Sequence, residues 1–390
     1  MTDAANPFVE TPERAELRKA AAALGAKYGA QYFMDCAKQG RKTDELWKDA
    51  GDLGFIGVNL PEEYGGGGAG MYELAIVMEE LAASGAGLLM LVVSPAICGN
   101  IIARFGTDDQ KKKWIPGLAD GSITMAFGIT EPDAGSNSHM ITTTAKRDGD
   151  DWILNGQKVF ISGVDQADAV LIVSRTEDAK TGKLKPALFI VPTDAKGFTA
   201  QMIDMELQNP EKQFTLFLDD VRLPSDALVG SEDAALSQLF AGLNPERIMA
   251  TASAVGTARF ALGKAVEYVN DRTVWKAPIG THQAIAHPLA QIKIELEASK
   301  LLMQKAATLY DAGDDWGAAE PANMGKYLAA ETAVKAVDQA VHSMGGNGLT
   351  AEYGVAPMLG LVRIMRIAPV SREMILNFVA TTSLGLPKSY

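Results

Sequence analysis

The hydrophobic pattern of this chain changes at about residue 123 and changes back at about residue 230, and this double change constrains the fold most. Before the first point, Ala-rich and Leu-rich segments repeat their apolar residues with the period of an α-helix. Between the two points the apolar runs are short, rich in Val, Ile and Phe, and separated by Gly- and Asp-containing turns. We therefore expect a helical domain at 1–122, a small β-barrel or sandwich at 123–230, and a helical domain at 231–390.

The third part is predicted to be a four-helix bundle, because four of its segments combine helical periodicity with the length of bundle helices. The four segments are Asn244–Asn270, Ile285–Ala312, Pro321–Met344 and Ala368–Leu386. The predicted fold class is thus mainly α with one β domain.

Composition excludes several classes of partner. With 36 basic and 48 acidic residues, the net charge of −12 argues against nucleic acid or an anionic membrane as the main partner. Cys36 and Cys98 form no CxxC pair, and the histidines are scattered, so no metal site is expected. The first residues lack a signal-peptide pattern, and no apolar run reaches the roughly 20 residues that span a bilayer. We expect a cytoplasmic protein.

The first candidate binding motif is the segment Ala126–Ser136. An apolar strand stops there at Thr-Glu-Pro, and Pro132, Gly135 and Ser136 force an irregular turn. Such a turn can aim backbone N–H groups and a hydroxyl at a flat polar ligand, although an ordinary β-turn would also explain it. Farther along, Trp152–Ser162 supplies a hairpin turn, a strand, an aromatic ring and a second hydroxyl.

Together, the ITEPDAGS and WILNGQKVFISG segments resemble the flavin-binding strands of the acyl-CoA dehydrogenase family. The stretch 268–280 with Gln283, and the Met-Gly-Gly-Asn-Gly sequence at 344–348, are also similar to that family. The helical–β–helical order is the family's own, so the resemblance covers nearly the whole chain. It implies FAD as cofactor, an acyl-CoA substrate, an electron-transferring flavoprotein as electron acceptor, and a homo-oligomer, usually a tetramer.

The resemblance also implies two groups of FAD contacts, matched position by position. The first group lies in the β domain and comprises Phe127, Ile129, Thr130, Phe160 and Ser162. The second comprises Arg272, Trp275 and Gln283, which match contacts to a neighbouring subunit's FAD, together with Gly345 and Gly346. Ser136 matches a position near the coenzyme A arm. The alternatives are core packing for the two phenylalanines, and a helix-surface ion pair with Asp271 or Glu267 for Arg272.

The catalytic base is where the sequence departs from much of the family. In medium-chain members a Glu near the start of the last long helix is the base, and this position falls on Pro369. We expect Glu373, four residues on, to be a solvated or capping residue. In a subgroup resembling isovaleryl-CoA and long-chain dehydrogenases, the base lies in a Leu-Asp-Leu-Glu-Arg pattern. That pattern matches Glu246 and Arg247, and it places Asn244 and Arg247 beside the substrate.

The resemblance therefore implies dehydrogenation of an acyl-CoA to its trans-2-enoyl product, with Glu246 removing the α-proton and flavin N5 accepting hydride. The alternative for Glu246 is a first-turn carboxylate that the helix N-terminus stabilises. The alternatives for the protein are an acyl-CoA oxidase, a flavin monooxygenase or a non-catalytic flavin-binding relative. Pro369 also lacks the N–H that helps hold the thioester oxygen in the family, so a donor at Val370 or a neighbour replaces it, or the stabilisation is weaker.

Overall fold

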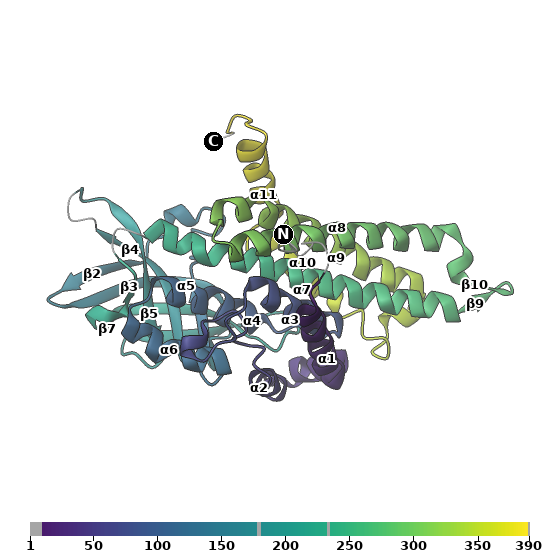
Figure 1. The fold of residues 1–390 in the computed structure, drawn as a ribbon, viewed down its shortest axis with the longest axis horizontal. Helices are drawn as coiled ribbons and strands as arrows, with labels where there is room; N and C mark the ends of the chain where they lie inside the picture. The colour runs from purple at the N-terminus through teal and green to yellow at the C-terminus, as the bar shows by residue number, and fades with distance from the viewer. Residues whose placement is uncertain (1–9, 178–180, 232–234, 389–390) are drawn as a thin grey trace, which may run out of the picture.

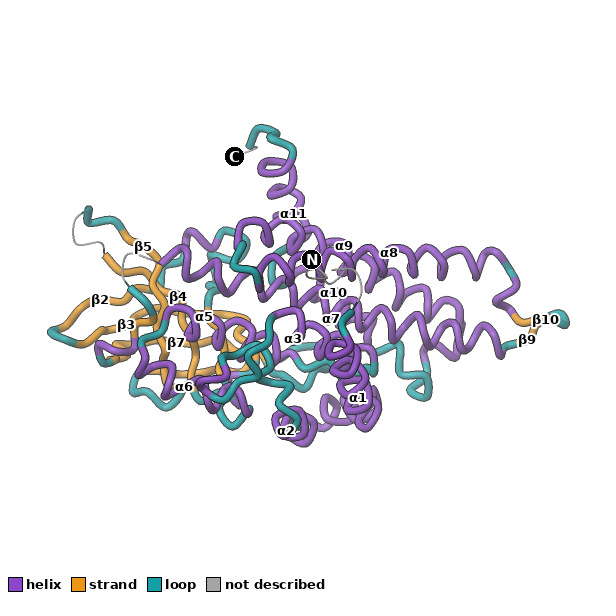
Figure 2. Tube along the Cα trace, in the orientation of Figure 1, coloured by secondary structure: helices purple, strands orange, loops and turns teal. Residues whose placement is uncertain are grey.

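The structure is a computed structural model that describes residues 10–177, 181–231 and 235–388. Strands gather at one end of an elongated molecule, and helices form the rest of it (Figure 2). The arrangement is the predicted one: a helical region, a sheet domain and a second helical region. Across the described residues, no helix combines the length and the apolar character that crossing a bilayer requires.

The first region is built from short and medium helices. Thr11 caps the first of them by accepting a hydrogen bond from the Arg14 backbone N–H at 3.3 Å, and Pro12 stands at the first helical position. An apolar stretch then runs through one short helix, a π-helical segment (Val92–Gly99) and a second helix, and it is almost wholly buried. The helices are α1 (Pro12–Gln39), α2 (Asp44–Asp52), α3 (Met71–Ala83), α4 (Leu89–Leu91), α5 (Asn100–Phe105) and α6 (Asp108–Asp120).

The sheet domain has the strand order β6-β7-β3-β2-β4-β5-β8, and β1 pairs with β4 in parallel. Its core packs Trp152 edge-on against Phe189, with ring centroids 5.1 Å apart. Strands β6 and β8 were not predicted from the sequence. The strands are β1 (Met125–Gly128), β2 (Thr144–Asp148), β3 (Asp151–Ser162), β4 (Ala169–Glu177), β5 (Leu184–Pro192), β6 (Phe198–Ile203), β7 (Gln213–Leu223) and β8 (Leu228–Val229).

The hairpin turn predicted within Trp152–Ser162 is absent. Asn155 and Gly156 lie inside β3, where the pairing with β7 shifts register. The amide of Asn155 exchanges two hydrogen bonds with Asp220 on β7, at 2.9 and 3.0 Å, and these hold the irregularity. Thr143 packs where a Cβ of Gly156 would lie, 2.4 Å from that position, so only glycine fits.

The C-terminal region is a bundle in which α7, α8 and α9 run along the long axis of the molecule (Figure 1). A short hairpin, β9 (Thr273–Val274) with β10 (Ala277–Pro278), joins α7 to α8 at the end distant from the sheet. The helices are α7 (Ala235–Asp271), α8 (Gln283–Asp311), α9 (Asp315–Met344), α10 (Met358–Ile367) and α11 (Arg372–Phe378).

Two helix boundaries differ from the prediction. The last helix, expected at 368–386, begins later, at Arg372 with Ser371 as its cap, and continues through a π-helical segment to Ser383. A separate helix, α10, precedes it and ends at Ile367. Pro369 falls in this break because proline cannot continue a helix and restricts the residue before it. Helix α7 also extends back to Ala235, although it was expected to start near Asn244.

Helix α7 passes through Pro245 because another helix replaces the bond that proline removes. Proline has no N–H for the carbonyl four residues before it, which belongs to Ala241. The hydroxyl of Tyr310 on α8 donates to that carbonyl at 3.0 Å. Glu246 consequently lies well inside α7, and the alternative that it is a first-turn carboxylate at a helix N-terminus is wrong.

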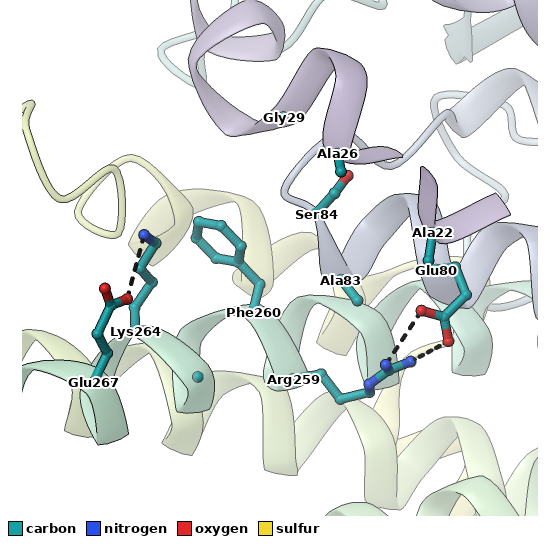
Figure 3. Close-up of a pocket in the computed structure, with 11 residues that line it drawn as sticks. Ala22, Ala26, Gly29, Glu80, Ala83, Ser84, Arg259, Phe260, Lys264 and Glu267 are labelled. Carbon is teal, nitrogen blue, oxygen red and sulfur yellow. Dashed lines mark hydrogen bonds and ion pairs between the residues drawn. The ribbon is translucent and has the colours of Figure 1, made fainter. Parts of the chain in front are cut away.

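A buried ion cluster ties the first region to the bundle. Glu79 and Glu80 on α3 are 0% and 5% exposed. Arg259 on α7 reaches a carboxylate oxygen of each at 2.6 Å, and Arg18 on α1 also pairs with both. Figure 3 shows Arg259 and Glu80 beside a surface groove of about 490 Å³ between α1, α3 and α7. This groove contains none of the predicted site residues.

Candidate active site

The turn after β1 carries two of the predicted flavin contacts, Ile129 and Thr130, which are partly exposed. The next residue, Glu131, is buried and pairs with Lys158 of β3, with a distance of 2.8 Å between Oε1 and Nζ. Lys158 also donates to the carbonyl of Ile129 at 3.1 Å. The backbone of Val159 donates to the carbonyl of Thr130 at 2.9 Å. The turn and β3 are therefore joined at the predicted flavin site.

The predicted contacts on β3 face outward from an irregular stretch of the strand. Phe160 has a left-handed φ of 57°, and its side chain is 58% exposed, so it is not a core residue. Phe127 on β1 is 9% exposed and packs in the core. The hydroxyl of Ser162 bonds to the amide of Gln213, and Ser136 is exposed in the turn after β1.

The second group of predicted flavin contacts lies at the other end of the molecule. Arg272 and Trp275 belong to the β9–β10 hairpin region, where Figure 1 shows the end distant from the sheet. Gly345 follows the end of α9, and the amide of Asn347 there bonds to the hydroxyl of Tyr268 on α7. From Glu246 to Asp271, α7 is roughly 38 Å long at about 1.5 Å per residue. One chain does not bring the two groups together.

Exposed residues in each group fit a flavin nucleotide. The Trp275 side chain is 86% exposed, and positions where Gly345 and Gly346 would carry a Cβ have no atom within 4 Å. Arg272 is exposed and forms no ion pair with Asp271 or Glu267 in the described part of the chain, so its guanidinium can bind phosphate oxygens. An exposed aromatic ring on β3 and an exposed arginine and tryptophan suit a ligand that is both aromatic and anionic.

Glu246 lies near Cys98 of the π-helical segment, and this segment packs against β1, the strand that leads into the first group. Cys98, in the π-helical segment, contacts the carbonyl of Ala126 in β1 at 3.5 Å. Burial raises the pKa of the Cys98 thiol, and the nearby charge of Glu246 adds to this effect. Burial also raises the pKa of the Glu246 carboxyl to about 7, while the charges of Arg247 and Lys326 act in the opposite direction. A carboxyl with this pKa can exchange a proton near neutral pH.

The two cations beside Glu246 are each held by other groups. Arg247 donates from Nε to the Asn323 side chain at 3.0 Å and from Nη1 to the carbonyl of Leu243 at 2.7 Å. Lys326 on α9 is 2% exposed and donates to the carbonyl of Val370 at 2.5 Å. Glu246 therefore has positive charge nearby without a direct ion pair among the described residues.

The remaining predicted residues have clear positions. Asn244 is buried, and its amide donates to the carbonyl of Asp315 at 2.8 Å, a contact between α7 and α9. The Glu373 side chain is 70% exposed in the first turn of α11, as expected for a solvated residue. Val370, beside Pro369, is tied to α9 through Lys326.

Sequence reasoning missed Lys158 and Lys326, although each left a signal. In β3, residues 152, 154, 156 and 158 share one face, so Lys158 stands on the buried side with Trp152 and Leu154. In α9, Lys326 interrupts a helical stripe of buried alanines that includes Ala322, Ala329 and Ala333. A charged residue on an otherwise apolar face indicates a buried partner.

Comparison with known proteins adds independent findings. The family models "Acyl-CoA dehydrogenase, N-terminal domain", "middle domain" and "C-terminal domain" match residues 11–122, 126–221 and 236–384. Acyl-CoA dehydrogenase FadE12 of Mycobacterium tuberculosis is 70% identical over 390 residues, which is 100% of both chains.

Two solved structures have nearly the same fold. Glutaryl-CoA dehydrogenase from Mycobacterium smegmatis in complex with FADH2 has a TM-score of 0.90 at 28% identity, covering 98% of this chain and 97% of that one. A chain from a structure of the electron transferring flavoprotein of Acidaminococcus fermentans has a TM-score of 0.90 at 29% identity, covering 97% and 99%. The chain belongs to the acyl-CoA dehydrogenase family and is a flavoprotein oxidoreductase with FAD as its cofactor.

Proposed function

We propose that the protein dehydrogenates an acyl-CoA thioester to the trans-2-enoyl-CoA, with Glu246 as the base that removes the α-proton. The observation that carries this proposal is the place of Glu246, which lies buried near Cys98 with a pKa near 7 and, among the described residues, without a direct ion pair. The position that holds the base in medium-chain members is Pro369 here, and the neighbouring Glu373 is exposed.

In this reaction the bound FAD supplies the acceptor for the β-hydride. Glu246 must be ionised when substrate arrives, and Arg247 and Lys326 favour that form through their charge. The α-proton moves to the Glu246 carboxylate, the hydride leaves the β-carbon, and a C=C bond forms between them. Because Pro369 has no N–H, the backbone donor for the thioester oxygen is Val370 or a neighbour, and Lys326 holds Val370 in place.

The FAD site is shared between two copies of the chain. Phe127, Ile129, Thr130, Phe160 and Ser162 of one copy contact the isoalloxazine, and Ser136 lies near the coenzyme A arm, with Asn244 and Arg247 on the substrate side. Arg272, Trp275, Gln283, Gly345 and Gly346 of a second copy contact the rest of that FAD. The separation of roughly 38 Å along α7 supports this, because one cofactor cannot bridge it within a chain. The assembly is a homo-oligomer, with a tetramer as the expected form.

The electron acceptor is an electron-transferring flavoprotein. Support comes from the likeness to a chain in a structure of such a flavoprotein and is therefore analogy. The test is to reduce the flavin with acyl-CoA without air and then add either oxygen or the flavoprotein. Fast oxidation by the flavoprotein and slow oxidation by oxygen are expected. Hydrogen peroxide formed in step with turnover would instead indicate an oxidase.

The test of the base is Glu246→Gln, which changes the shape and volume of the side chain little. The variant should keep its yellow FAD and bind acyl-CoA, while flavin bleaching in stopped-flow slows by about 10²–10⁴-fold. Glu373→Gln is the matched control, because that carboxylate is exposed, and it should bleach at the normal rate. If Glu246→Gln is reduced at the normal rate, Glu246 is not the base.

A further inference from the structure

Two buried charged side chains connect the two segments of the first flavin group. Lys158 is 0% exposed and Glu131 is 4% exposed. Besides its bond from Lys158, the Glu131 carboxylate accepts hydrogen bonds from the backbone N–H of Thr142 at 2.5 Å and from the Thr142 hydroxyl at 2.8 Å. It also accepts one from the backbone N–H of Thr143 at 3.0 Å. Lys158 in turn donates to both Glu131 and the carbonyl of Ile129. The pair therefore joins the turn after β1, the segment before β2, and strand β3.

The pair sits where the backbone departs from regular geometry. The register between β3 and β7 shifts between Lys158 and Ile161, and Phe160 in this bulge has φ of 57°. The Val159 N–H bonds to the carbonyl of Thr130 directly beside the pair. A left-handed non-glycine residue persists only where its surroundings fix it. Lys158 and Val159 provide that restraint, because they bind the bulge to the turn.

Packing alone does not require charges at this place. Replacing a buried ion pair by apolar residues of similar volume is often neutral or stabilising, so a buried pair is weak support for stability. A methionine at position 158 could fill the same space but could not bond to Ile129. What the pair supplies beyond packing is one fixed geometry for the turn and the bulge.

We propose that Lys158 and Glu131 are a positioning pair that holds the Ile129–Thr130 turn and the Phe160 bulge in the arrangement that receives the isoalloxazine. The proposal rests on the flavin contacts assigned above to Ile129, Thr130 and Phe160. Neither charged side chain touches the cofactor; both act through the backbone that they hold.

The ionisation of both groups supports a charged pair at neutral pH. Burial opposes ionisation of Glu131, but the hydrogen bonds from Lys158, Thr142 and Thr143 outweigh it and lower the pKa of the carboxyl to about 2. Burial lowers the pKa of the Lys158 ammonium to about 8, although Glu131 acts in the opposite direction.

The experiment compares Lys158→Met, Glu131→Gln and the double variant with the wild-type holoenzyme. The measurements are the thermal midpoint, the Kd for FAD after cofactor removal, and the visible circular dichroism of bound FAD. Arg222→Met is the matched control, because it removes exposed ion pairs with Asp148 and Asp151 at the opposite end of β3. It should leave the FAD measurements unchanged.

Each single variant leaves one buried charge without its partner, so its thermal midpoint should fall. The double variant has no buried charge and should recover most of that midpoint. Its Kd for FAD should nevertheless stay about tenfold or more above wild type, which corresponds to at least one lost hydrogen bond, with altered dichroism. If the double variant recovers both stability and normal FAD binding, the pair is only structural and the proposal is overturned. If a single variant does not fold, the double variant alone decides.

Phe160→Ala separates this proposal from the flavin-site assignment. It should weaken FAD binding by itself, because it removes a ring contact to the isoalloxazine. Normal FAD binding in Phe160→Ala would show that the assigned flavin contacts are wrong. Weakened binding in Phe160→Ala together with normal binding in the double variant would refute only the positioning role.

Discussion

Replacing Lys326 by methionine should move the pH dependence of catalysis to higher pH. Lys326 is 2% exposed on α9, and its charge favours the ionised form of Glu246 on the adjacent α7. Packed helix axes are about 8–10 Å apart. A unit charge at that distance and an effective dielectric constant of about 20 contributes roughly 2 kcal/mol. This corresponds to about one pK unit of the Glu246 carboxyl, or slightly more.

The expected result follows from the ionised fraction of the base. With a pKa of about 7, about half of Glu246 is ionised at pH 7. With a pKa of about 8, the fraction falls to roughly one tenth, so kcat/KM at pH 7 should fall about fivefold. At pH 9 Glu246 is ionised in both proteins, and this part of the difference should disappear.

The assay is kcat/KM for one acyl-CoA from pH 5.5 to 9.5, because this ratio reports the pKa values of the free enzyme. Lys335→Met is the matched control: Lys335 lies on the same helix, is exposed, and pairs with Glu295 at 2.8 Å. Its profile should match wild type. A loss in Lys326→Met that is equal at every pH would mean that Lys326 only supports Val370. An unchanged profile would refute the electrostatic reasoning altogether.

Three further predictions concern stability and assembly. The pKa of the Glu246 carboxyl is about 7 in the folded protein, above its ordinary value of 4.5. Ionisation of Glu246 therefore lowers the free energy of unfolding, by an amount that grows as the pH rises from 4.5 and is complete above about 7. The total loss is at most about 3 kcal/mol. In the FAD-depleted protein, Glu246→Gln should therefore raise the thermal midpoint more at pH 8 than at pH 5, and an equal gain would contradict this. Arg272→Glu should yield colourless or dissociated protein; full flavin occupancy with the wild-type oligomer size would remove Arg272 from the FAD site. Arg259→Met should lower the free energy of unfolding by about 3 kcal/mol in urea, because it leaves buried Glu79 and Glu80 with fewer partners. The control is Lys293→Met, which removes an exposed ion pair with Glu297 and should change the free energy of unfolding by less than about 1 kcal/mol.

The local sequence determined the fold class and the family. The hydrophobic periods of strands and helices depend only on residues that are close in sequence. The change from a helical to a strand pattern at residue 123, and the return to a helical pattern after residue 230, could therefore be predicted without tertiary contacts. The ITEPDAGS turn and the second strand segment likewise carry their own turn and β-forming residues, and the family comparison confirms the resemblance based on them. The same reasoning misplaced the Asn155–Gly156 turn, because an Asn-Gly pair also suits a bulge when a partner such as Asp220 holds it.

Only the tertiary structure decided the environment of the candidate base and the distance between the two groups of predicted cofactor contacts. Glu246 lies inside α7 because Tyr310, distant in sequence, binds the carbonyl that Pro245 leaves free. Its pKa depends on burial and on Lys326 from another helix. The length of α7 separates Arg272 from Thr130, which agrees with the expectation that Arg272 contacts a neighbouring subunit's FAD. These properties arise from contacts and distances between residues far apart in the chain, which local sequence patterns do not specify.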